Sequence, residues 1–132
     1  MEKKYLKKII ARSPEDLQVI AACCSESKAK ISDIKFLPLN KIFLLSLSRK
    51  DNEKDDNNNL INSIIKFEYI ESSKSKNINQ KKHDELIELI TIDVYKMDQK
   101  FKITLYFNKH RFITLIAEVI EVTLEDQKII ND

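Results

Sequence analysis

The chain has 132 residues, of which 42% are hydrophobic and 33% are charged, and its formal net charge at pH 7 is +2. We expect one domain over residues 1–132, because a chain of this length supports a single core. The near balance of charge gives no overall field that would attract nucleic acid or an anionic membrane. Glycine is absent, which excludes phosphate-binding loops, dinucleotide fingerprints and nucleophile elbows, since each needs glycine at a sharp turn or a close backbone approach.

The sequence also favours a cytoplasmic location without membrane contact. Its apolar runs are far shorter than the roughly 20 residues of a membrane-spanning helix, and too few apolar residues accompany the N-terminal lysines for a signal peptide. Cys23 and Cys24 are adjacent in a predicted helix, where a bond between neighbours would break the helical geometry. We expect two free thiols that pack as small apolar side chains.

Residues 13–24 form the segment that is most clearly helical. Ser13 is a good N-cap, Pro14 suits the first helical position, and Asp16 stands where a capping box places its acid. One apolar stripe follows, made of Leu17, Ile20, Ala21 and Cys24 and widened by Val19 and Cys23. A helix of three turns is marginal alone, so we expect this stripe to pack on a sheet.

The other apolar segments show the two-residue period of strands. We expect strands at 4–11, 28–37, 41–49, 61–71, 86–97, 101–108 and 112–124. Mobile polar loops should lie at about 50–60, which is acidic, and at 72–85, which is basic. The predicted class is α+β, with a bent antiparallel sheet or half-open barrel of about seven strands and one helix near the N-terminus.

Two features of the last third of the chain bear on its path. In 112–124 the apolar positions shift from odd to even numbers after Val119, which indicates a bulge or a corner between two sheet segments. Residues 125–132 are expected to form a tail that can include a short helical turn. Between the two preceding strands, a turn with Asn108 in the left-handed region is favoured over a two-residue connection, because glycine is missing.

Two charged side chains near strands are the first candidate contacts. Arg49 ends an apolar strand and Glu53 follows four residues later. The arginine could hold this carboxylate as a loop clamp, or bind the carboxylate or phosphate of a ligand. Glu118 lies between apolar neighbours in the last predicted strand, where a charge is costly. It could pair with a lysine or arginine, or mark a pocket.

The basic loop is the second candidate. Its cations are Lys74, Lys76, Lys81, Lys82 and His83, to which Lys109, His110 and Arg111 could be added. Such a surface could bind an anionic ligand or nucleic acid, or simply be solvated. The chain has no tryptophan, and Phe101, Phe107 and Phe112 occupy core-like positions, so no stacking platform for single strands is evident.

We expect no metal, no cofactor and no catalytic residue. The acidic loop resembles a calcium loop only superficially, because it lacks the required glycine and the terminal glutamate. His83 and His110 have no carboxylate or cysteine at ligand spacing. No serine stands at a strand-to-helix elbow.

Five segments together resemble, in the expected order, an alphaproteobacterial family of small proteins catalogued as domain of unknown function 2948. They are 6–11 (Leu-Lys-Lys-Ile-Ile-Ala), 14–20 (Pro-Glu-Asp-Leu-Gln-Val-Ile), 36–38 (Phe-Leu-Pro), 43–49 (Phe-Leu-Leu-Ser-Leu-Ser-Arg) and 116–126 (Ile-Ala-Glu-Val-Ile-Glu-Val-Thr-Leu-Glu-Asp). The family commonly has Trp before the glutamate that matches Glu53, where this chain has Asn52, and its glycine-bearing final hairpin is replaced by 108–110. The resemblance implies a bacterial, cytoplasmic single domain and brings no known activity.

Three hypotheses of function follow. The first is a non-enzymatic protein-interaction module, which offers its sheet edges to a protein partner or a second copy. The second is a binding domain for an anionic ligand or nucleic acid through residues 74–83 and Arg111. The third, ranked last, is a small hydrolase-like enzyme that uses Glu118 or Glu53.

Overall fold

The computed structural model describes residues 6–50 and 60–130, apart from the side chains of the last two. These residues form ten strands and one α-helix. In chain order the elements are β1 (Lys8–Ala11), α1 (Pro14–Cys24), β2 (Lys28–Lys30), a 3₁₀ turn (Ile31–Asp33), β3 (Ile34–Leu37), β4 (Ile42–Lys50), β5 (Leu60–Phe67), β6 (Ile70–Lys76), β7 (Leu86–Met97), β8 (Lys100–Phe107), β9 (Arg111–Ala117) and β10 (Val122–Ile130).

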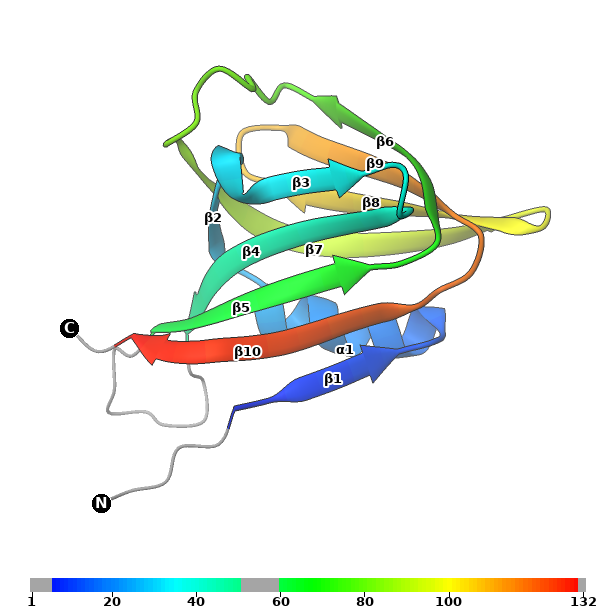
Figure 1. Ribbon diagram of the computed structural model, residues 1–132, viewed down its shortest axis with the longest axis horizontal. Helices are drawn as coiled ribbons and strands as arrows, with labels where there is room; N and C mark the ends of the chain where they lie inside the picture. The colour runs from blue at the N-terminus through cyan, green and yellow to red at the C-terminus, as the bar shows by residue number, and fades with distance from the viewer. Residues whose placement is uncertain (1–5, 51–59, 131–132) are drawn as a thin grey trace.

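All ten strands belong to one antiparallel sheet with the order β1-β10-β5-β4-β2-β7-β8-β9-β6, and β3 pairs with β4. The sheet is strongly curled, with β6 at the top of Figure 1 and with α1 beside β1 at the bottom. The α+β class with a bent antiparallel sheet is therefore confirmed. We call β1, β10, β5, β4, β2 and β3 the first half of the sheet, and β7, β8, β9 and β6 the second half.

The predicted number of about seven strands was wrong because three predicted strands are each split in two. The 3₁₀ turn divides 28–37, and a bend at residues 68–69 divides 61–71. Tyr69 at this bend has φ 60°, a conformation that is uncommon for a residue with a Cβ. Residues 118–121 divide the third, so the odd-to-even shift marks a corner, with β9 in the second half and β10 in the first.

The two bends are hydrogen-bonded to each other. The Glu118 N–H donates to the Tyr69 carbonyl at 2.9 Å, and the Glu68 N–H donates to the Glu121 carbonyl at 2.9 Å. The chain therefore passes twice between the halves at the same place. On each side of the corner the inward residues follow the predicted shift, since Ile113, Leu115, Ala117, Ile120, Val122 and Leu124 are all buried. Val119, expected to end the odd-numbered inward series, is instead 48% exposed because it lies in the corner itself.

The helix α1 follows the sequence prediction closely. Ser13 caps it by accepting a hydrogen bond from the Asp16 N–H at 3.1 Å, and the buried residues are Leu17, Ile20, Ala21 and Cys24. Val19 is 53% exposed, so the apolar stripe is narrower than predicted. The helix packs against β7 and β1. Within residues 6–50 and 60–130, no helix has the length and apolar character needed to cross a membrane.

Three local predictions were wrong. Residues 125–130, expected in a tail, belong to β10, which pairs with both β1 and β5. Residues 72–76, expected in the basic loop, belong to β6. In the turn after β8 the left-handed residues are Lys109 (φ 60°) and His110 (φ 56°), and Asn108 is not among them.

Candidate functional site

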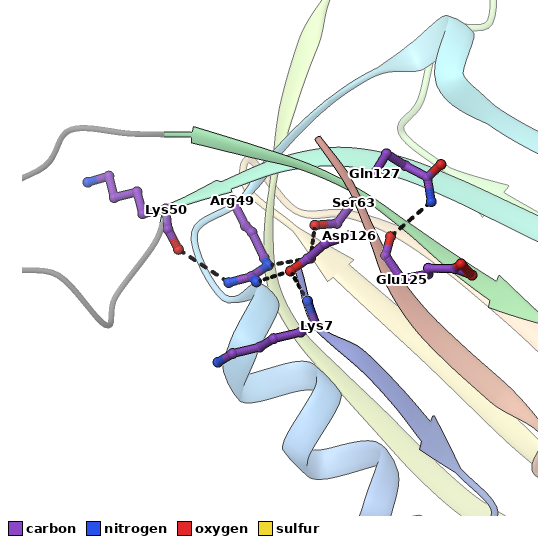
Figure 2. A network of polar contacts seen from close by, with 7 residues as sticks. All are labelled: Lys7, Arg49, Lys50, Ser63, Glu125, Asp126 and Gln127. Carbon is purple, nitrogen blue, oxygen red and sulfur yellow. Dashed lines mark hydrogen bonds and ion pairs between the residues drawn. The ribbon is translucent and has the colours of Figure 1, made fainter. Parts of the chain in front are cut away.

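Arg49 lies in a buried ion pair with a residue that the sequence analysis missed. Its Nη2 and Nε donate to the two carboxylate oxygens of Asp126 at 2.7 and 3.1 Å. The Ser63 hydroxyl donates to the same carboxylate at 2.6 Å, and the Lys7 backbone N–H donates at 2.8 Å (Figure 2). The side chains of Arg49 and Asp126 are 4% and 0% exposed. This network joins β4, β5 and β10 to the segment before β1.

The electrostatics of the pair indicate a structural role. Burial alone would raise the pKa of Asp126, but hydrogen bonds from Arg49, Ser63 and Lys7 outweigh it and hold that pKa below its ordinary 3.8. Burial opposes the charge of Arg49 too, yet Asp126 raises the pKa of its guanidinium. Both groups are thus charged at neutral pH and satisfied by one another. The Nε and Nη2 of Arg49 are both hydrogen-bonded to Asp126. Glu53, the predicted partner of Arg49 in a loop clamp, lies outside the described residues.

The strand period contains a signal for this pair. Arg49 continues the inward series of Phe43, Leu45 and Leu47 on β4. Asp126 likewise continues the inward series of Val122 and Leu124. Two opposite charges on inward-facing series predict a buried pair, provided that residues 125–130 are recognised as a strand.

Glu118 pairs with a lysine, which was one of its two predicted outcomes. The Lys41 Nζ donates to its carboxylate at 3.0 Å, and both side chains are partly exposed. Glu118 lies in the corner after β9 and not inside a strand, so its charge remains in contact with water. This geometry supports ion pairing for Glu118 and lends no support to a role as a buried acid.

The predicted basic cluster is distributed over several elements. Lys81, Lys82 and His83 are exposed between β6 and β7, and the His83 carbonyl accepts a hydrogen bond from the Ser32 N–H at 3.0 Å. Arg111 is buried; its Nη1 donates to Glu85 at 3.0 Å and its Nε to the Asn108 carbonyl at 3.1 Å. We infer that these hydrogen bonds of Arg111 stabilise the turn after β8. The remaining two lysines of the predicted cluster, Lys74 and Lys76, lie on β6.

The cysteines are free, as predicted. Cys24 is fully buried in the core, where burial, followed by the neighbouring Cys23, raises the pKa of its thiol to about 12. A thiol with so high a pKa stays protonated near neutral pH and is a poor nucleophile. Elsewhere in the described part of the chain, no group of three or more His, Cys, Asp or Glu residues could hold a metal ion.

The outer surface of the first half has two adjoining hollows that share Ile64 and Gln127. The larger, about 370 Å³, lies over β2, β4 and β5, and the smaller, about 310 Å³, lies over β1, β10 and β5. Aliphatic side chains and lysines line both hollows. We call this surface the lysine-rimmed face and define it by Ile10, Leu44, Ile64, Lys8, Lys28, Lys30 and Lys66. These lysines are far apart in the chain, so their spacing does not predict that they lie on one surface.

The outer surface of the second half is different, and we call it the aromatic face: Tyr95, Tyr106, Phe112, Lys74, Lys76 and Lys102. Cross-strand pairing places Lys76 beside Phe112 and Phe112 beside Tyr106. The core-like placement predicted for Phe112 was therefore wrong, whereas Phe107 is buried and Phe101 packs against the core, as predicted. Phe112 immediately precedes the inward Ile113, so the strand period points it outward.

Comparison with known proteins identifies a family for the chain. The model of the family described as "Protein of unknown function (DUF2948)" matches residues 7–130, so the chain belongs to this family. No curated protein and no solved structure matches the chain. The family assignment agrees with the resemblance noted in the sequence, and its description assigns no activity.

Proposed function

We propose that this DUF2948 protein is a non-enzymatic protein-interaction module of the bacterial cytoplasm, which binds an acidic surface of a protein partner on its lysine-rimmed face. The observation that carries the proposal is the pair of adjoining hollows with aliphatic side chains among lysines.

The composition of the face suits a protein partner. Protein interfaces commonly have an apolar centre that excludes water and a polar rim that sets orientation. Leu44 and Ile64 are diagonal neighbours, since Leu44 pairs with Lys66 and Ser46 pairs with Ile64. Ile10, which is 45% exposed, extends the apolar surface onto β1. These aliphatic side chains would form the centre of the interface.

The charges of the face favour an acidic partner. Among the described residues that line the two hollows, four are lysines and two, Asp33 and Glu125, are acids. Cross-strand pairing adds Lys35 beside Leu44. Complementary charge speeds association and rejects wrong partners. A partner with carboxylates around an apolar patch would therefore match this surface.

The face is also preorganised. Phe43, Leu45, Ile65 and Phe67, on the inner side of the same strands, are almost completely buried. The Arg49–Asp126 pair connects β4 to β10 below the same face. Side chains on such a rigid sheet lose little backbone freedom when a partner binds.

The test is quantitative affinity capture from a lysate of the native host, using the full chain and two charge-reversal variants. The face variant is Lys8→Glu with Lys66→Glu. Its matched control is Lys81→Glu with Lys82→Glu, which makes the same change of net charge in the loop before β7. Circular dichroism and thermal unfolding verify that both variants fold.

We expect the wild type and the control variant to capture a stoichiometric, nuclease-resistant protein, and the face variant to retain less than about a tenth of it. Capture should also weaken as salt is raised, because the rim is exposed to solvent. Equal capture by a folded face variant, loss of the captured material on nuclease treatment, or no captured protein at all would contradict the proposal.

A further inference from the structure

We infer that the aromatic face of the second half binds single-stranded nucleic acid. The inference is independent of the proposed function, because it concerns other strands and other side chains. It rests on three observations: a row of side chains that places two rings beside a lysine, a further exposed ring on the same face, and the charge and shape of the surface around these rings.

The first observation is a row of side chains across four strands. Cross-strand pairing aligns Lys76 of β6, Phe112 of β9, Tyr106 of β8 and Thr91 of β7. The Tyr106 and Phe112 ring centroids are 6.1 Å apart with the planes tilted by 50°, and the Lys76 Nζ lies over the Phe112 ring, 5.6 Å from its centroid. One ring can thus contact a base while the lysine beside it contacts the adjoining phosphate.

The second observation is a further ring on the same face. Tyr95 pairs with Lys102 on β8, and Lys102 and Tyr106 point to the same side because they are four residues apart on one strand. Four residues span roughly 13 Å. Tyr95 is 59% exposed. Its ring is therefore available to a different base of the same strand from the one that contacts Tyr106 or Phe112.

The third observation is the charge and shape of the surface. Lys74 on β6 and Asp93 on β7 are the two ends of the next row of paired residues across the sheet. This row lies between the row that contains Tyr106 and Phe112 and the row that contains Tyr95. A hollow of about 570 Å³ is lined by Tyr106 and Phe112 together with Lys109 and His110, and by one acid, Asp93. Lysines beside aromatic rings are the combination that sequence-tolerant single-strand binding uses, since stacking and phosphate contacts do not depend on base identity.

The occupant follows from the rings. A duplex hides the faces of its bases, whereas a single strand can place them on exposed aromatic side chains. The lysine-rimmed face has lysines, but the described residues that line its two hollows include no aromatic ring. The second half is therefore the surface that we assign to a single strand, whether DNA or RNA.

Fluorescence anisotropy with labelled, mixed-sequence oligonucleotides of about 12 nucleotides would test the inference. Single-stranded DNA, single-stranded RNA and a duplex are titrated at two salt concentrations against the full chain. The stacking variants are Tyr95→Ala and Phe112→Leu, of which the second preserves apolar bulk. The charge variant is Lys74→Ala with Lys76→Ala. Lys8→Ala with Lys66→Ala, on the opposite half, is the matched control.

We expect at least one single strand to bind more tightly than the duplex, and each stacking variant to weaken that binding about 10-fold. The charge variant should reduce the slope of log K against log salt by about one to two. The control variant should bind like the wild type, apart from a small loss of affinity that is the same for all the oligonucleotides. No single-strand binding at low salt, equal binding of the duplex, or full binding by folded Tyr95→Ala and Phe112→Leu would overturn the inference.

Discussion

The two halves of the sheet share one hydrophobic core but present different outer surfaces. In the first half, the outward positions of β1, β4 and β5 combine aliphatic residues with lysines. In the second half, Tyr106 and Phe112 take the corresponding outward places on β8 and β9. Inward positions on both halves are constrained by packing, whereas the outward ones are free to vary. The two outer surfaces therefore differ in chemistry although the strands beneath them pack in the same way.

The halves also differ in how they hold opposite charges together. The Arg49–Asp126 pair of the first half is almost fully buried, with three kinds of donor on one carboxylate. In the second half, Lys100 and Glu71 form a pair at 2.7 Å whose side chains are 50% and 28% exposed. Because water competes with exposed pairs, the similar distances conceal very different contributions to stability.

The largest effect on stability should come from breaking the buried pair. Asp126→Asn leaves the Arg49 charge buried without its counter-charge, and we expect it to lower the free energy of unfolding by about 3–5 kcal/mol. Urea denaturation of the wild type and the variant measures this loss. Arg49→Met is the reciprocal variant, and a double-mutant cycle should give a strong coupling between the two sites. A loss below about 1 kcal/mol for both single variants would show that the pair is not structural.

The same pair predicts a pH dependence with a definite sign. The pKa of folded Asp126 lies below its ordinary 3.8, so the carboxylate stabilises the fold fully above that value. Its contribution is lost as pH falls below 3.8 and passes through the lower folded pKa. The difference in stability between wild type and Asp126→Asn should therefore be constant near neutral pH and shrink in acid. A difference that grows as the pH falls would contradict this assignment.

The exposed pair of the second half should contribute much less. Lys100→Ala removes one partner of the ion pair while water remains available to Glu71, so we expect a much smaller loss in the free energy of unfolding than that of Asp126→Asn. The same denaturation experiment measures it, and added salt should reduce the difference further. A loss as large as that of Asp126→Asn would mean that burial does not distinguish the two halves.

Much of the fold could be predicted from the sequence. The cap at Ser13 and the four buried helical positions follow from spacing, and the shift of apolar positions after Val119 marks the corner between the halves. The breaks within strands were harder to find because the chain has no glycine. Left-handed turn positions are held by ordinary residues such as Glu26 and Tyr69, so the usual signals of a sharp turn are missing.

The candidate surfaces were less predictable than the fold. Lys8, Lys28 and Lys66 come together only through the pairing order of β1, β10, β5, β4 and β2. The spacing of residues along the sequence does not predict which strands pair. Phe112 could have been placed from its own strand, since its neighbours Ile113 and Leu115 alternate inward. Asp126 was missed because residues 125–132 were interpreted as a tail, which hid the continuation of an inward-facing series.

The most direct test of the two-surface account is to map binding on the isotopically labelled full chain by amide chemical-shift changes in NMR spectra. The chain would be titrated separately with the single-stranded oligonucleotide and with the protein recovered by affinity capture. The account predicts that the oligonucleotide shifts amides of β6, β7, β8 and β9, while the protein shifts amides of β1, β2, β4 and β5. Shifts from both titrants on the same half of the sheet would contradict it.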